Sequence, residues 1–273
     1  MSEFEPFLDV LDRSLRDFAA DFWEQALVIQ IYNGEIRSKN EKIEFINSIE
    51  FDSNITKFYL GLNSGKHYFA INREFTSDGR SLKQIHPNLS ELEIAIAMQA
   101  LALINWHESH THCARCGIPT NVVAHGWIRE CEIDGSQHFP RTDPAVIVLV
   151  KDRKNRLLLG RQKVWAEKRF SNFAGFVEPG ESLENAIRRE IKEETGLEVS
   201  EINYLSSQPW PFPASIMMAF SAVTDEPEKA VADGNEIVEL KWFSKNELLN
   251  SEIVLPDNLS ISRKMINYWL DNE

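Results

Sequence analysis

The chain has 273 residues, of which 43% are hydrophobic, and it carries a formal net charge of −13 at pH 7. This length predicts one large domain or two smaller ones, and the acidic balance excludes a protein that holds nucleic acid by a broad basic surface. An anionic small molecule stays compatible with that charge, because a bound metal can supply the local positive charge.

The cysteine content and the two ends of the chain indicate a cytoplasmic protein. Three cysteines in a chain of this length form no disulfide framework, which is typical of a reducing compartment. The acidic start MSEFEPFLDVLDRSL resembles no signal peptide, and no apolar run reaches the length of a membrane span. The end YWLDNE carries no peroxisomal tripeptide.

Residues 1–105 are predicted to form an α+β domain. ALVIQIY at 26–32 is a candidate strand, and FYLGLNSGKHYFAIN at 58–72 reads as strand, Asn-Ser-Gly turn and strand. Ser90 and Glu93 have the spacing of a capping box ahead of the apolar run LEIAIAMQALALINW, which predicts a long helix. No cluster of residues in this part indicates chemistry by itself.

Residues 106–140 are rich in His, Cys and Gly and lack aliphatic periodicity, which predicts a small module between two larger parts. Residues 141–273 then resume α/β patterning, with AVIVLV at 145–150 as a buried strand. The chain contains no internal repeat. The other elements expected here are strands at 156–161, 215–223 and 236–243 and a terminal helix at 262–270.

An acidic helix is predicted between Ser182, a good N-cap, and Gly196, which suits the position after the last turn. Leu183, Ala186, Ile187 and Ile191 recur at helical spacing and form its apolar stripe. Glu190, Glu193 and Glu194 are expected to lie together off the Ile187/Ile191 stripe, although like charges at this spacing repel by roughly 0.2–0.5 kcal/mol per pair. Two interpretations are open: a solvated acidic face, or a site for Mg²⁺ or Mn²⁺.

The wider pattern resembles the Nudix box. Gly175 is followed after five residues by Glu181, and after seven more by Arg189-Glu190-Ile191-Lys192-Glu193-Glu194-Thr195-Gly196-Leu197. The resemblance implies that residues 141–273 form a Nudix domain, an α/β/α sandwich around a mixed sheet. It also implies hydrolysis of a nucleoside diphosphate linked to another moiety.

The resemblance assigns roles within the box. Glu190 and Glu194 would ligate divalent cations, and Glu193 would either ligate or act as the general base. The carbonyl of Ala174 would be a backbone ligand. Arg189 and Glu181 would form an ion pair that holds the loop against the helix, and Gly175 would allow a turn. Metals at such a site lower the pKa of the attacking water and neutralise the charge that grows on phosphate oxygens.

A second stretch, SQPWPFPAS at 207–215, bears on the substrate. Its three prolines stiffen an extended loop, Trp210 and Phe212 offer flat faces to a heteroaromatic ring, and Gln208 and Ser215 offer hydrogen bonds. The alternative is a packed structural loop. The stretch resembles the signature of the NADH pyrophosphatase branch of the Nudix family, and the order of the three parts of the chain is also similar to that branch.

The branch resemblance implies cleavage of NAD(H) at its pyrophosphate into nicotinamide mononucleotide and AMP. Removal of NAD caps from RNA 5′ ends, or hydrolysis of another dinucleotide, is the alternative. A homodimer with a pocket completed across the interface is expected. The resemblance adds Glu236 as a further metal ligand. It places the following residues at the substrate: Gln208, Pro209, Trp210, Pro211, Phe212, Pro213, Ala214, Ser215, Ser262, Phe139 and Lys83.

The middle module resembles a zinc ribbon with one ligand replaced. Cys113-Ala-Arg-Cys116 is followed by Gly117 as zinc knuckles prefer, but the second knuckle reads Cys131-Glu-Ile-Asp134. Asp134 has the spacing of the fourth ligand. His138, His110, His112 and His125 are other candidates, and loss of the metal, with the module held by packing alone, is the remaining alternative.

A non-catalytic nucleotide sensor is a third kind of function for such a chain. Nudix-like regulators usually degrade the box and add a DNA-binding domain. The box is intact here, and no basic recognition helix is apparent, so the sequence favours the enzyme.

Overall fold

The computed structural model describes residues 4, 7 and 10–272 and divides them into two compact units. The N-terminal unit contains residues 10–142 and Pro209–Ser215. The C-terminal unit contains Asp143–Gln208 and residues 216–272, together with Phe4 and Phe7. The predicted division at 140/141 lies close to the change of unit at Thr142/Asp143, while the division at 105/106 stays a prediction.

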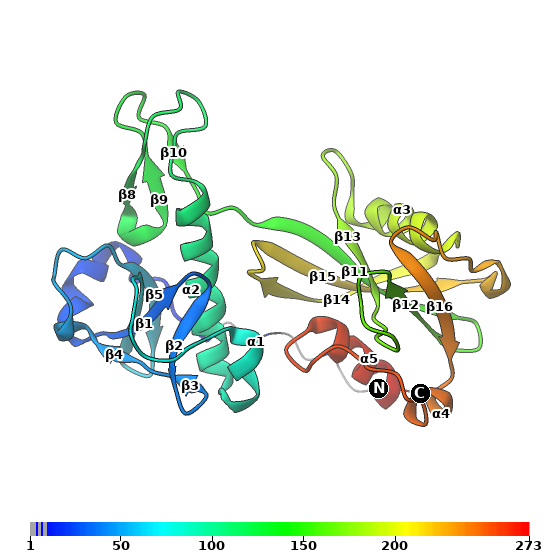
Figure 1. Ribbon diagram of the computed structural model, residues 1–273. Helices are drawn as coiled ribbons and strands as arrows, with labels where there is room; N and C mark the ends of the chain where they lie inside the picture. The colour runs from blue at the N-terminus through cyan, green and yellow to red at the C-terminus, as the bar shows by residue number, and fades with distance from the viewer. Residues whose placement is uncertain (1–3, 5–6, 8–9, 273) are drawn as a thin grey trace. The chain divides into compact units, whose positions relative to one another are not determined.

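A mixed sheet forms the body of the N-terminal unit (Figure 1), with strand order β3-β2-β1-β6-β5, β4 paired to β1 and β7 paired to β2. β1 and β6 are parallel, and the other pairs in this sheet are antiparallel. The strands are β1 Leu27–Tyr32, β2 Glu35–Lys39, β3 Lys42–Ile43, β4 Ile46–Asn47, β5 Phe58–Asn63, β6 Lys66–Asn72 and β7 Gly79–Arg80.

The long helix α2 (Glu91–Ser109) packs on β1, β5 and β6. It begins with the predicted capping box, in which Ser90 N donates to Glu93 Oε2 at 2.8 Å and Glu93 N donates to Ser90 Oγ at 3.3 Å. The β5–β6 hairpin turns at Ser64 and Gly65, both with positive φ, as two-residue hairpins require. The other helical segments are η1 Arg16–Gln25, η2 Ser48–Glu50, α1 Leu82–Ile85 and η3 His86–Asn88.

The middle module is a small antiparallel sheet of β10 (Gln137–His138), β9 (Ile128–Glu130) and β8 (Asn121–Val123), with η4 (Ala124–Gly126) between β8 and β9. It belongs to the N-terminal unit. Arg129 in β9 and His107 in α2 are buried against each other, so the module and the helix share a polar core.

The C-terminal unit is a sheet of order β14-β15-β11-β12-β16, with β13 paired to β11. Alternate residues of β11 enter two cores, with Val146, Val148 and Val150 in the core on the α3 side and Ile147 and Leu149 in the core on the α5 side. The strand is buried on both faces, which is why it reads as a continuous apolar run. The strands are β11 Asp143–Asp152, β12 Leu157–Gln162, β13 Phe173–Phe176, β14 Ser200–Trp210, β15 Ser215–Thr224 and β16 Ile237–Phe243.

The helices of this unit are α3 (Leu183–Thr195), α4 (Lys245–Leu249) and α5 (Ile261–Asp271), with the short segment η5 (Pro227–Lys229) ahead of β16 (Figure 1). With α3 and α5 contributing to the two cores, the unit is the predicted α/β/α sandwich. The sequence missed β13 and β14. The stretch 207–215 was expected as an extended loop, but it forms the end of β14, a turn and the start of β15.

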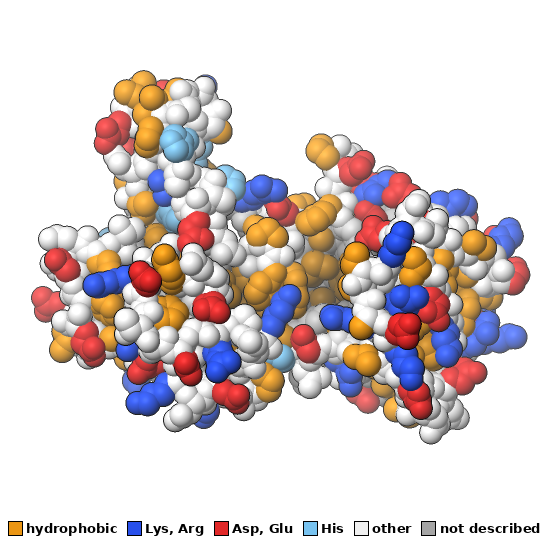
Figure 2. Space-filling model, in the orientation of Figure 1, with side chains coloured by type: hydrophobic (Ala, Val, Ile, Leu, Met, Phe, Trp, Pro, Cys, Tyr) orange, Lys and Arg blue, Asp and Glu red, His pale blue; other side chains and the backbone are white. Residues whose placement is uncertain are grey.

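Among the described residues, no helix is both long enough and apolar enough to cross a membrane. On the face seen in Figure 2, acidic and basic side chains are intermixed, and no continuous basic patch is visible.

Candidate active site

The loop before α3 and the helix itself are set by local capping. Ser182 Oγ accepts a hydrogen bond from Asn185 N, and Gly196 ends the helix in the left-handed conformation with φ 71°. Both positions are those expected from the sequence. The helix therefore begins and ends at fixed points, and this places its carboxylates relative to β13.

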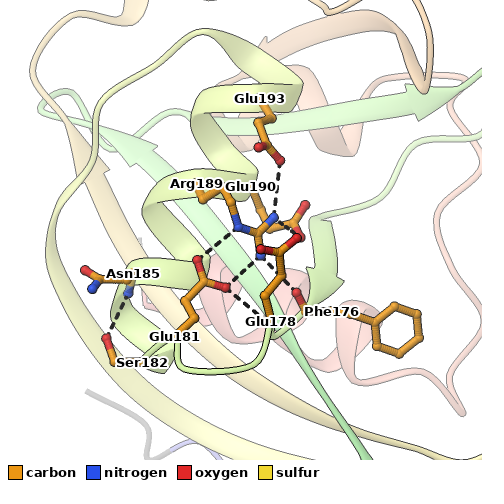
Figure 3. A network of polar contacts seen from close by, with 8 residues as sticks. All are labelled: Phe176, Glu178, Glu181, Ser182, Asn185, Arg189, Glu190 and Glu193. Carbon is orange, nitrogen blue, oxygen red and sulfur yellow. Dashed lines mark hydrogen bonds and ion pairs between the residues drawn. The ribbon is translucent and has the colours of Figure 1, made fainter.

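Arg189 is the centre of a network of carboxylates (Figure 3). Its Nε and Nη2 donate to the two oxygens of Glu181 at 2.9 and 2.8 Å, which is the ion pair that the motif implies. Its Nη1 also donates to Glu190 Oε1 at 2.8 Å and Glu193 Oε2 at 3.2 Å, and its Nη2 to the Phe176 carbonyl at 3.0 Å. The hydrogen bonds from Arg189 lower the pKa of Glu181. Through its contacts with Glu181, the Phe176 carbonyl and the two glutamates, one guanidinium links the loop, β13 and α3.

Glu194 is the most unusual of the carboxylates. Its side chain is only 5% exposed, and its Oε2 has no hydrogen-bond partner in the described structure. Burial first, and then the negative charges of Glu236 and Glu190, raise the pKa of Glu194 to about 8. A buried carboxylate without a partner is costly unless a cation is bound to it.

The position of Glu194 corrects one expectation from the sequence. It was expected off the apolar stripe, but it is buried on the same side of α3 as Ile187 and Ile191. It follows those residues by seven and three positions, which is the spacing of one helix face. Glu193, whose side chain is 59% exposed, lies off the stripe as expected.

Gly175 also has a different role from the expected turn. It lies inside β13, paired with Val146, and its φ is outside the left-handed region. A Cβ added at this position would lie 1.9 Å from Glu190 Cδ. The absence of a side chain at Gly175 is therefore what leaves room for the Glu190 carboxylate.

Two further predicted ligands lie in the same unit. Ala174 lies in β13, one residue before Gly175 and paired with Ile147. Glu236 is exposed in the loop before β16, and its charge raises the pKa of both Glu190 and Glu194, although for both residues burial is the larger cause. Oxygen ligands of this kind are those that Mg²⁺ and Mn²⁺ prefer, and the unpartnered buried oxygen of Glu194 fits such an ion.

Gln208 was expected to offer hydrogen bonds to a ligand, but its amide is bonded within the protein. It is fully buried, its Nε2 donates to the Leu259 carbonyl at 2.6 Å, and its Oε1 accepts from Ile261 N at 2.7 Å. Both ends of the amide are used to hold β14 to the start of α5. Ser262 is also buried, and its hydroxyl contacts Ser171 Oγ at 2.8 Å and Asn172 Nδ2 at 2.9 Å.

The aromatic residues of the 207–215 stretch lie in the N-terminal unit with Lys83. Trp210 and Phe212 meet edge to face at 5.0 Å, and the Lys83 ammonium lies 5.5 and 4.7 Å from their ring centroids. Asn105 Nδ2 donates to the Pro211 and Pro213 carbonyls at 3.0 and 3.2 Å. Phe139 is 62% exposed, Pro209 and Pro213 are exposed, Ala214 is half-buried and Ser215 is buried.

The ribbon module brings its four candidate ligands together. Atoms of Cys113, Cys116, Cys131 and Asp134 all lie within 4.8 Å of one another, whereas His110, His112, His125 and His138 are outside this group. The three cysteines are free thiols. One ion could contact all four side chains, which is the arrangement of a structural zinc site.

The two knuckles of the module have the same backbone. Cys113 N donates to Ile118 O and Gly117 N to Cys113 O, while Cys131 N donates to Ser136 O and Gly135 N to Cys131 O. Asp134 therefore holds the position in the second knuckle that Cys116 holds in the first. Ser136 donates to Asp134 Oδ1 from its hydroxyl at 2.6 Å and its backbone at 2.9 Å, which lowers the pKa of Asp134 to about 2.

Comparison with known proteins agrees with this geometry. Residues 141–267 match the NUDIX domain, and residues 108–139 match the NADH pyrophosphatase zinc ribbon domain. An NAD-capped RNA hydrolase NudC from Mycobacterium bovis is 37% identical over 232 residues, which cover 77% of this chain and 74% of that protein. The chain belongs to the Nudix hydrolase family.

Other similar proteins include the NAD-capped RNA hydrolase NUDT12 of Macaca fascicularis. It is 30% identical over 283 residues, which cover 94% of this chain and 60% of that protein. Among solved structures, a NUDIX hydrolase from Nitrosomonas europaea matches with a TM-score of 0.47 and 21% identity over 58% of this chain and 90% of that one.

Three residues near the Nudix carboxylates were not foreseen from the sequence. Phe176 is 59% exposed, although it directly follows Gly175 and its carbonyl binds Arg189. Gln162 and Asp233 make hydrogen bonds with the segment that carries Glu236. No local pattern marks Gln162, whereas Asp233 ahead of Gly234 could have been identified as a turn residue.

Proposed function

We propose that this Nudix hydrolase cleaves the pyrophosphate of NAD(H) with water, giving nicotinamide mononucleotide and AMP. The observation that carries the proposal is the buried, unpartnered carboxylate of Glu194 among Glu190 and Glu236. Such a group suits a divalent cation, and divalent cations are the usual partners of a pyrophosphate in hydrolysis.

The ligands of Mg²⁺ or Mn²⁺ would be the carboxylates of Glu190, Glu194 and Glu236 and the carbonyl of Ala174. Glu193 would either be a further ligand or accept the proton of the attacking water. A bound ion of this kind lowers the pKa of water and neutralises charge on phosphate oxygens. Arg189 keeps Glu190 and Glu193 in place through Nη1, and Gly175 leaves the space that Glu190 occupies. The exposed ring of Phe176, whose carbonyl binds Arg189, offers a flat apolar surface to a base.

Two matched variants test the metal site. Glu194→Gln and Glu190→Gln should each abolish most turnover of NADH and leave circular dichroism and gel-filtration behaviour unchanged. Glu184→Gln is the control, because Glu184 is exposed in the first turn of the same helix. Near-normal turnover in either of the first two variants would contradict the proposed roles.

Product analysis in ¹⁸O-labelled water with NADH and Mn²⁺ tests the bond that is cleaved. The expected products are the two mononucleotides, with the label in only one of them, which identifies the phosphorus attacked. A single unlabelled pair of products, or products other than two mononucleotides, would contradict water attack at the pyrophosphate.

NAD-capped RNA is the second candidate substrate, and the names of the relatives favour it. A net charge of −13 disfavours a long RNA footprint, but a cap requires few phosphate contacts. Turnover of free NADH and of a short NAD-capped RNA should be compared at matched concentrations and salt. A much larger kcat/KM on the capped RNA would make decapping the main activity.

We propose further that Cys113, Cys116, Cys131 and Asp134 hold one structural zinc ion in each chain. Support comes from the grouping of the four ligand atoms and from the matching backbone of the two knuckles. Metal analysis of protein purified without chelator should find zinc, and Asp134→Ala should lose most of it. Protein that is folded but contains only trace zinc would contradict a structural site.

The substrate contacts that we propose on the family resemblance are Lys83, Phe139, Ser262 and the residues of 209–215, which include Trp210 and Phe212.

We also propose a homodimer in the cytoplasm. The free thiols of all three cysteines suit a reducing compartment. Light scattering tests the dimer, and a fully active monomer would contradict a pocket shared between subunits.

A further inference from the structure

We propose that Gln162 and Asp233 are positioning residues that hold Glu236 beside Glu194 before any metal ion binds. The inference rests on the proposed metal site and adds to it the side chains that keep an exposed ligand, Glu236, in place. All of the residues concerned lie in the C-terminal unit.

Glu236 needs such support because its surroundings repel it. It is exposed and directly precedes β16, and β16 contacts α3, the helix that carries Glu190 and Glu194. An exposed carboxylate beside two others lowers its energy by turning away into water. A conformation that points toward the cluster therefore requires contacts from the protein.

Gln162 supplies a direct contact with the carboxylate. Its Nε2 donates to Glu236 Oε1 at 2.8 Å, and the next residue, Lys163, donates from its backbone N to the Glu236 carbonyl at 3.0 Å. The end of β12 thus binds both the side chain and the main chain of Glu236. An amide donor suits this position because it binds a carboxylate without adding a charge that would compete with a cation.

A β-bulge places Gln162 where it can make this contact. Arg161 pairs with Glu239 across β12 and β16, so a regular ladder would pair Gln162 with Val238. The register shifts between Arg161 and Gln162, and Gln162 pairs with Ile237 instead. The shift moves Gln162 one residue closer to Glu236, and bulges commonly redirect a side chain in this way.

Asp233 fixes the loop from its other end. Its Oδ2 accepts from Asn235 N at 3.2 Å and Glu236 N at 3.0 Å, and its Oδ1 accepts from Ile237 N at 2.7 Å. The Gly234 N donates to the Ile237 carbonyl at 2.9 Å, with Gly234 at a φ of +76°. Three backbone donors on one carboxylate set the path of the chain through Glu236.

The expected consequence is a preorganised ligand. Partners that orient metal ligands typically contribute 10–100-fold to metal affinity. Loss of the Gln162 amide should therefore weaken Mn²⁺ binding by about tenfold, while the fold stays intact because Gln162 is only half-buried.

The test is the affinity for Mn²⁺ without substrate, measured by electron paramagnetic resonance of the free ion, in Gln162→Ala and Gln162→Met. The Met variant keeps about the size of the side chain but has no amide donor and adds no charge. Both variants should bind Mn²⁺ about tenfold more weakly than the wild type, with little change in Tm of the metal-free protein. Wild-type affinity in Gln162→Met would show that only the packing of the side chain matters and would overturn the proposal.

Gln137→Met is the matched control. Gln137 Nε2 donates to Glu130 Oε2 at 3.1 Å in the ribbon module, which belongs to the N-terminal unit. The substitution therefore removes the same kind of amide–carboxylate hydrogen bond from a unit that does not contain the Nudix carboxylates. It should leave Mn²⁺ affinity unchanged. In a Glu236→Gln background, Gln162→Ala should cause no further loss, and an additive loss would mean that Gln162 acts on some other group.

Glu194→Gln separates this proposal from the one on which it rests. If Glu194→Gln also leaves Mn²⁺ binding unchanged, the metal site itself is wrong. If Glu194→Gln weakens binding and the Gln162 variants do not, the metal site stands and the positioning role is wrong. Asp233→Ala, which removes all three backbone contacts, should weaken Mn²⁺ binding at least as much as Gln162→Ala.

Discussion

At the residue scale, the Nudix site depends on space as much as on charge. Gly175 and Glu190 are fifteen positions apart in the sequence. In the structure, the Glu190 carboxylate occupies the place where a Cβ of residue 175 would lie. A glycine in the motif suggests a turn. The structure shows instead that residue 175 lies in the paired strand β13 and must be glycine to leave room for the Glu190 carboxylate.

Gly175→Ala should displace Glu190 and leave the fold intact, because the atoms in its way are the end of a flexible side chain. Misplacement of a reacting group by about 1 Å can cost about 10²-fold in rate, so a loss of that order is expected in kcat for NADH. Steady-state kinetics and a thermal melt check this. In a Glu190→Ala background the same substitution should cost nothing more, and a large further loss would contradict the clearance argument.

At the residue scale the sequence identified the carboxylates but misjudged their surroundings. The spacing of Glu190, Glu193 and Glu194 predicted that they lie together off the apolar stripe, but Glu194 is buried on the side of Ile187 and Ile191. It did not show that Glu194 is buried and that Glu193 is not, because burial depends on what packs against α3. Gln208 was expected to face a ligand, but its amide joins β14 to α5.

At the scale of elements, Arg189 joins three successive segments of the chain: β13, the loop after it and α3. Its guanidinium contacts Glu181 in the loop, the Phe176 carbonyl in β13, and Glu190 and Glu193 in α3. A lysine keeps the charge but cannot make these contacts at once, because its ammonium is a point donor.

Arg189→Lys should therefore reduce the free energy of unfolding by about 2 kcal/mol, the scale of hydrogen bonds to charged groups. Urea titration measures this. Arg188→Lys is the control, because Arg188 is exposed on the same helix and donates to the Glu184 carbonyl and Asn185 Oδ1, both on that helix. Equal stability in the two variants would mean that the network contributes little.

A second link between elements joins the ribbon module to α2. His107 is buried, it stacks on Phe58 at 4.4 Å, and its Nε2 lies 2.8 Å from the Gly126 carbonyl. Its Nδ1 lies 3.0 Å from Arg129 Nη1. Because Arg129 can only donate, Nδ1 accepts and Nε2 carries the proton, so the neutral imidazole fits this site.

This arrangement predicts a pH dependence of stability. Burial, opposed by the Gly126 carbonyl and assisted by Arg129, lowers the pKa of His107 to about 4 from 6.5. Between these values the unfolded chain binds a proton that the folded one does not. The contribution of His107 to stability is therefore complete above pH 6.5 and falls, by up to roughly 3 kcal/mol, as the pH drops toward 4.

Urea titrations at neutral pH and at pH 5 check this prediction. His107→Gln should flatten the pH dependence, because glutamine can accept from Arg129 and does not titrate in this range. His112→Gln, at an exposed histidine, should keep the wild-type slope. An unchanged slope in His107→Gln would exclude His107 as its source.

At the scale of the whole molecule, each proposed metal site lies within one compact unit. The carboxylates belong to the C-terminal unit, and Cys113, Cys116, Cys131 and Asp134 belong to the N-terminal unit. A ligand stabilises only the part that must be folded to bind it.

Calorimetry should therefore show that Mn²⁺ and zinc act on different parts of the unfolding profile. Mn²⁺ should raise the temperature at which the C-terminal unit unfolds, and removal of zinc should lower that of the N-terminal unit. Glu194→Gln should remove the first effect and keep the second. If both metals shift the entire profile equally, the two units unfold as one.

The sequence by itself determined the periodic elements and the chemistry that recurs at fixed spacing: the strands around 145–150, the capped helix α3, the Nudix box and the first zinc knuckle. These depend on neighbours along the chain, so local pattern is enough to predict them. The tertiary structure decided which carboxylate is buried without a partner, that Gly175 provides clearance, that Asp134 holds the place equivalent to Cys116, and that Gln162 reaches Glu236. Those facts depend on strand pairing and packing between distant segments, which no local pattern contains.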